Sequence, residues 1–112
     1  MYSAASEEAA HYLRRAVRLY TGLGRESEAR RARSRLALLH TINREYEAAA
    51  SLYEQLYYAI ETSPDWRQRE KFCRNIAYNC LLMEDYDSAL FWGHKAASLL
   101  EEGDISYEPL QK

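Results

Sequence analysis

Basic, amide and phenolic side chains recur at helical spacing in two stretches of this sequence. Within each stretch, two of them are four residues apart and share one face if the segment is helical. Guanidinium groups bind carboxylates and phosphates through paired hydrogen bonds, an asparagine amide can bond a peptide backbone, and a tyrosine can pack on it. The candidate set is Arg31 and Arg35 in the first stretch and Lys71, Arg74, Asn75 and Tyr78 in the second. The alternative is that these are solvated side chains on exposed helix faces.

Catalytic and metal-binding patterns are missing from the sequence. The histidines, His11, His40 and His94, fall in three separate segments, without the paired histidines and intervening glutamate of a zinc protease. His40 occupies a position expected to face the core, where a hydrogen-bonded buried histidine is the simpler interpretation. Glycine-rich phosphate loops and nucleophile elbows do not occur either. We therefore predict a protein that is not an enzyme and uses no metal or cofactor.

The two cysteines, Cys73 and Cys80, are seven residues apart within one expected helix. They share a face of that helix but lie about 10 Å apart along its axis, which is too far for a disulfide. We expect both to be small, buried apolar side chains.

Charge is divided between successive segments. Residues 25–35 contain five arginines against two glutamates, and residues 67–74 contain four basic residues against one glutamate. The segments that follow are acidic: residues 45–61 contain four glutamates and no base, and residues 84–102 contain five acids and one lysine. The whole chain has a net charge of −2, and its acidic segments would repel a nucleic-acid duplex. Nucleic-acid binding is therefore the weaker alternative for the arginine-rich segment.

Composition indicates one globular domain. The chain has 112 residues, of which 47% are hydrophobic and 29% charged. No stretch approaches the twenty or so apolar residues of a membrane helix, and the first thirty residues carry charges where a signal peptide would be apolar. A cytoplasmic location is expected.

The elements that must position these residues repeat along the chain. The sequence aligns with itself without a gap at an offset of forty residues, so that Ala9 falls on Ala49 and then on Ala89. Tyr46 falls on Tyr86 in the same way, and each tyrosine lies between two acids. A fixed period of this length is typical of a solenoid, in which each unit buries its apolar face against its neighbours.

Apolar residues at three- and four-residue steps predict helices throughout, joined by tight turns as antiparallel neighbours. The five expected helices cover about residues 6–20, 26–43, 45–61, 65–83 and 86–102. Glycine within residues 21–24 can supply the left-handed residue that closes the first helix, and residues 63–65 can start the fourth. Gly103 is expected to end the fifth helix, after which Asp104 would cap a further, unfinished one.

The residues around Tyr86, and those around Tyr46 in the earlier copy, resemble the tetratricopeptide repeat. The resembling residues are Ile76, Ala77, Cys80, residues 85–89 and Ala96, and in the earlier copy Leu36, Ala37, residues 45–49, Tyr53 and Leu56. The usual tryptophan of the first helix is replaced by Arg33 and Cys73, and the period of forty residues resembles the long-helix branch of the family rather than its usual 34-residue form.

The resemblance implies an all-α fold of antiparallel helix hairpins, stacked as a right-handed superhelix of five helices. Residues 26–61 and 65–102 would be its repeats, residues 6–20 an unpaired second helix and residues 103–112 a tail, within one domain over residues 1–112. First helices line the concave groove in this family, so the groove would be basic. The expected function is binding of an acidic or phosphorylated peptide or partner protein by the candidate set.

A different function remains open, in which the chain is a structural element that assembles with itself. The unpaired first helix and the incomplete end after Gly103 would then form dimers or longer stacks, unless the chain is a part of a longer array. Tyr57 and Tyr58 are adjacent and cannot both face inward. Whichever is exposed, or Trp66 in the connection between the repeats, is a further candidate to anchor a partner.

Overall fold

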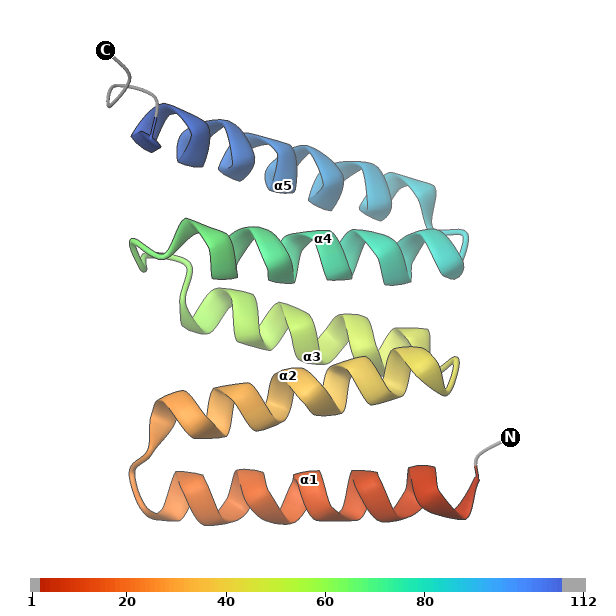
Figure 1. The fold of residues 1–112 in the computed structure, drawn as a ribbon. Coiled ribbons are helices and arrows are strands. Elements are labelled where there is room, and N and C mark those ends of the chain that lie inside the picture. Colours follow the sequence, from red (N-terminus) through yellow and green to blue (C-terminus); the bar gives the residue numbers. More distant parts are fainter. Residues whose placement is uncertain (1–2, 108–112) are drawn as a thin grey trace.

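The computed structural model describes the backbone of residues 3–107 and the side chains of residues 3–103 (Figure 1). The helices are α1 (Ala4–Gly22), α2 (Glu26–Ile42), α3 (Tyr46–Ala59), α4 (Trp66–Leu82) and α5 (Tyr86–Tyr107). They pack antiparallel as consecutive pairs, and the described residues form no strand. The fold is therefore all-α with five helices, as expected from the apolar periodicity.

Short polar side chains start three of the helices. Ser3 accepts a hydrogen bond from the backbone N–H of Ser6 at 3.0 Å, at the start of α1. The carboxylates of Asp65 and Asp85 accept equivalent bonds at the starts of α4 and α5, each at 3.3 Å. Each cap satisfies a backbone donor that the first helical turn leaves without an intrahelical partner.

Three of the four turns between helices close in the same way. The residue with left-handed backbone is Gly24 (φ 73°) after α1, Arg44 (φ 64°) after α2 and Glu84 (φ 63°) after α4. In each turn the next residue donates its backbone N–H to a carbonyl five residues earlier, at 2.8 to 2.9 Å. Arg44 and Glu84 are forty residues apart, so the period seen in the sequence is matched by local backbone geometry.

The expectation that Gly103 ends the fifth helix is wrong, because α5 continues through it to Tyr107. Gly103 is buried against the indole ring of Trp66, and a Cβ atom at this position would collide with that ring. Glycine is required here for close approach between two elements, not for a left-handed turn. The separate helix that Asp104 was expected to cap is therefore a continuation of α5.

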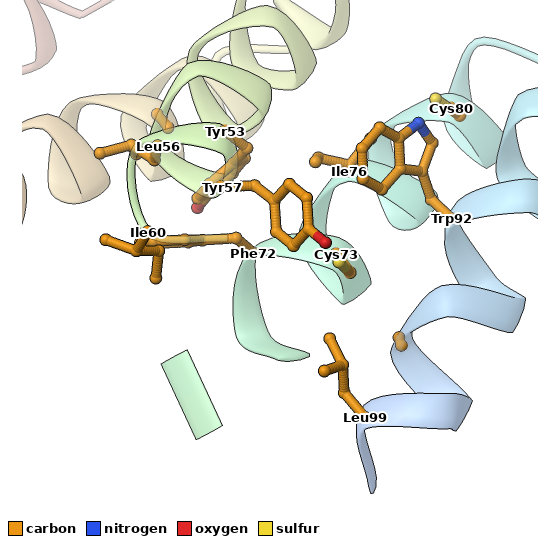
Figure 2. Close-up of a cluster of buried hydrophobic side chains, with 12 residues drawn as sticks. Tyr53, Leu56, Tyr57, Ile60, Phe72, Cys73, Ile76, Cys80, Trp92 and Leu99 are labelled. Atoms are coloured by element: carbon orange, nitrogen blue, oxygen red, sulfur yellow. The ribbon is translucent and has the colours of Figure 1, made fainter. Parts of the chain in front are cut away.

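The core lies mainly between α3, α4 and α5, with α4 in the middle (Figure 2). Phe72 of α4 packs against Tyr53 of α3, with ring centroids 6.1 Å apart. Tyr57 of α3 meets Trp92 of α5 edge to face at 5.5 Å. By contrast, α1 contains no fully buried residue. Apolar burial, which provides most of the folding free energy, is therefore concentrated in the C-terminal three helices.

The molecule is an open array of helices. Its radius of gyration is 15.6 Å, where about 13 Å is expected for a compact domain of this size. Each helix packs mainly against the helices next to it in sequence, and the array measures 53 × 38 × 21 Å (Figure 1). As a result, α1 and α5 each have one helix neighbour and one uncovered side. None of the helices within the described residues is long and apolar enough to cross a membrane.

Candidate functional site

A cleft of about 140 Å³ lies between α2 and α4, which are not consecutive in the chain. Two members of the candidate set, Arg31 of α2 and Lys71 of α4, line this cleft together. The other lining residues are Ser27, Arg30, Ser34, Gln68 and Phe72. Three of the lining residues are basic and none is acidic. We call this the α2–α4 cleft.

The α2–α4 cleft lies toward the N-terminal ends of its two helices. Its lining residues come from the first half of α2 and the first two turns of α4. Because these helices are separated by two reversals of direction, they run parallel, and both present the positive end of the helix dipole on the same side. A carboxylate or phosphate in the cleft would meet mainly the side-chain charges, because the partial charge of a helix end falls off within the first turn, where only Ser27 and Gln68 of the lining residues lie.

Arg35 and Tyr78 lie outside the cleft. Arg35 lines a second depression of about 100 Å³ between α1 and α2, which it shares with Arg31. Tyr78 is exposed and lies seven residues after Lys71, so it shares the exposed face of α4 about 10 Å further along. The side chains of Arg31, Arg35 and Lys71 make no hydrogen bond or ion pair within the part of the chain that the structure describes.

The remaining candidates already bond to their own helix. Arg74 donates from Nε and Nη2 to the carboxylate of Glu70, at 2.9 and 3.3 Å. Glu70 is only 7% exposed, so Arg74 neutralises a carboxylate that is almost fully buried. The amide of Asn75 donates to the backbone carbonyl of Lys71 at 2.9 Å. The candidate set is thus divided into side chains that can meet a ligand and side chains that support α4.

A buried polar contact that the sequence interpretation missed connects α2 to α4 beyond the cleft. The hydroxyl of Thr41 donates to Oδ1 of Asn79 at 3.1 Å, and Nδ2 of Asn79 donates to the carbonyl of Asn75 at 2.9 Å. Asn79 is fully buried. The sequence itself marks Asn79 as a buried polar residue, because it lies seven residues after Phe72 on a helix face that is otherwise apolar. This contact helps to fix the spacing of the two helices that form the cleft.

His40 is a partly buried histidine with a local partner. Its Nδ1 atom lies 2.7 Å from Oε1 of Glu45, across the turn between α2 and α3. Burial lowers the pKa of His40, and the nearby charge of Arg14 lowers it further. The contact agrees with the interpretation of His40 as a hydrogen-bonded histidine, but the side chain is only partly buried and lines a depression between α1 and α2 instead of the core. Among the described residues, no three His, Cys, Asp or Glu side chains gather in a way that could hold a metal ion.

Both cysteines are free and buried, as expected. Burial raises the pKa of the Cys73 thiol from 9.0 to about 11, although the charge of Lys95 opposes this shift. Burial also raises the pKa of Cys80. Of the adjacent tyrosines, Tyr57 faces inward and Tyr58 is exposed. Tyr58 is therefore the member of that pair that a partner could contact.

Comparison with known proteins gives no match at any level. No protein-family model matches the sequence, no curated protein matches it, and no solved structure matches its fold.

Proposed function

We propose that this chain is a protein–protein interaction module that holds an acidic or phosphorylated peptide segment in the α2–α4 cleft. The observation that carries the proposal is that Arg31 and Lys71, which belong to different helices, line the same cleft. These residues are forty positions apart, occupy equivalent places in the repeated sequence and line one cleft, and none of the lining residues of that cleft is acidic. Binding alone, without bond-making, is the proposed mechanism.

The repeated sequence supports the same proposal. If α2 and α4 are first helices of tetratricopeptide-like repeats in a right-handed superhelix, the cleft lies on the concave side, where such repeats hold peptides. A guanidinium and an ammonium group from adjacent helices can bind two anionic groups of one ligand. Arg35 and Tyr78 would extend the surface on either side, while Arg74 and Asn75 would support α4 from within.

Charge reversal in the cleft tests the proposal. The variant carries Arg31→Glu and Lys71→Glu, and the matched control carries Arg15→Glu and Arg18→Glu on α1, with the same change in net charge. Binding of fluorescent acidic and phosphoserine peptides would be measured by polarisation at low and physiological salt. We expect the cleft variant to bind at least tenfold more weakly and the control to bind like the original chain, apart from weaker long-range attraction at low salt. Equal losses in both variants would refute the proposal.

Self-association is a second candidate function, favoured by the uncovered side of α1. Tyr12, Leu19 and Leu23 are large apolar residues with more than half of their surface exposed. Light scattering over a wide range of concentrations distinguishes this function, since a molecular mass that stays that of one chain excludes it. A mass that rises with concentration, and falls back with Tyr12→Arg and Leu19→Arg, would support it.

A further inference from the structure

The uncovered side of α5 carries an ordered apolar stripe, which we call the outer stripe. Its members follow one another at steps of four, three, four and three residues, the spacing that keeps side chains on one face of a helix. They are Tyr86, Leu90, Gly93, Ala97 and Leu100. Tyr86 and Leu90 are 60% and 61% exposed, and Leu100 is 47% exposed. Such large side chains in a row are uncommon on a surface that has no partner.

The same stripe is covered in the copy on α3 and partly covered in the copy on α1. Forty residues earlier it consists of Tyr46, Ala50, Tyr53 and Tyr57 of α3 and of Ile60, which directly follows that helix. All of these except Tyr46 are buried, and Tyr53 packs on Phe72 of α4. Eighty residues earlier, Ser6 of α1 donates a hydrogen bond to Asn43, which follows α2, at 3.0 Å. On α3 this stripe is covered by α4, the helix that follows, and Tyr57 also meets Trp92 of α5; on α1 the equivalent residues are only partly buried.

The two covering helices share a chemistry. Both α2 and α4 are amphipathic and rich in basic residues, with four arginines in α2 and three arginines and one lysine in α4. The outer stripe is flanked by exposed carboxylates, Asp87 beside its start and Glu101 beside its end. A basic helix placed there would meet opposite charge at both ends, whereas two copies of α5 would bring acid against acid.

The middle of the outer stripe also favours a particular shape of partner. Gly93 and Ala97 stand where α3 has Tyr53 and Tyr57, so the centre of the stripe is shallow and its ends are bulky. Nothing lies within 4 Å of the place where a Cβ atom of Gly93 would be. A partner helix with a large apolar residue at its centre would fill this space and approach closely.

From these observations we infer that the outer stripe of α5 binds one basic amphipathic helix of another polypeptide, antiparallel to α5, as α4 lies on α3. This surface is separate from the α2–α4 cleft, and the inference does not depend on peptide binding there. It adds a second binding surface of a different kind, which binds the apolar face of a helix instead of an acidic segment.

The probe for this inference is a fluorescent peptide with the sequence of residues 65–83, which contains α4. Both cysteines are replaced by alanine, and a lactam on the exposed face keeps the peptide helical. We expect micromolar binding to the intact chain and at least tenfold weaker binding to the variant Leu90→Asp with Ala97→Glu. The cleft variant Arg31→Glu with Lys71→Glu should bind this peptide as the original chain does, which separates the two surfaces.

Two controls make the result decisive. A peptide in which every arginine and lysine is glutamate should not bind, and amide shifts in a labelled chain should change along residues 86–100. The substituted residues are exposed, so the stripe variant should unfold at the same urea concentration as the original chain. The inference is overturned if the peptide does not bind, if both peptides bind alike, or if the amide shifts change elsewhere. It is also overturned if the stripe proves to pair two copies of this chain, shown by a dimer that Leu90→Asp dissociates.

Discussion

At the scale of single residues, Arg74 shows how a side chain that looks suited to binding can instead stabilise the fold. Arg74→Ala removes both hydrogen bonds to Glu70 and leaves a carboxylate that is 7% exposed without its partner. We expect the free energy of unfolding to fall by about 1 to 3 kcal/mol, measured by urea denaturation. Lys71→Ala, one turn away on the exposed face, should change it by less than about 0.5 kcal/mol.

The pair Glu70→Leu with Arg74→Ala separates the ion pair from other effects of the substitution. With no carboxylate left to neutralise, most of the stability lost in Arg74→Ala should return, because an apolar replacement of both partners is often neutral. The double-mutant cycle gives the coupling energy directly. If Arg74→Ala is as mild as Lys71→Ala, Glu70 does not need this partner.

Cys73 supplies a prediction on pH. Its thiol has a pKa of about 11 in the folded chain and 9.0 when unfolded, because burial disfavours the thiolate. The unfolded chain therefore releases this proton first, and the stability that Cys73 contributes is complete below pH 9 and is lost as pH rises toward 11. We expect Cys73→Ala to reduce the steepness of this alkaline decline in urea denaturation.

In the native chain at pH 8, neither thiol should react with an aromatic disulfide reagent within the time that denatured chain takes to react fully.

At the scale of helices, two effects oppose each other at Gly103: helix propensity favours alanine there, and packing against Trp66 favours glycine. Alanine favours a helix over glycine by about 1 kcal/mol, but a Cβ atom at Gly103 would collide with the ring of Trp66. Overpacking of this kind costs about 1 to 3 kcal/mol, so we expect Gly103→Ala to lower the unfolding midpoint in urea. In a Trp66→Ala background the collision is gone, and the same substitution should raise stability. Stabilisation in both backgrounds would show that Trp66 moves aside without loss.

Helix positions were predictable from sequence because apolar periodicity and caps are local. The structure has all five helices at the expected places, except that α5 continues past residue 102 to Tyr107, and it confirms the closing glycine at Gly24. Gly103 was misjudged because a glycine that closes a helix and one that admits a neighbouring ring look alike until Trp66 is positioned. The partners of Arg74 and Asn75 were four residues away in the chain, but nothing in the sequence says whether such side chains turn to their own helix or to solvent.

At the scale of the whole molecule, the period of forty residues gives Arg31 and Lys71 equivalent positions, and these are the two members of the candidate set that the fold brings to one cleft. Arg31 and Lys71 line one cleft, and their meeting depends on tertiary packing between helices that are not consecutive. Burial was less predictable, because equivalent positions have different surroundings at the ends of an open array. Tyr53 is buried between two helices, whereas the equivalent Leu13 on α1 is only partly buried.

This uneven burial predicts that the chain opens from its first helix. α1 has no buried residue and one helix neighbour, whereas α4 lies between two helices and carries Phe72 and Ile76 in the core. Local opening is least costly where few apolar contacts are lost, so backbone amides of α1 should exchange with deuterium at the lowest free energy and those of α4 at the highest. Hydrogen exchange by mass spectrometry, with mild urea added, should show α1 exchanging while α3 to α5 remain protected. If α1 and α4 exchange at one common free energy, the array of five helices unfolds as a single unit. Contacts between neighbouring helices would then outweigh the differences in burial among them.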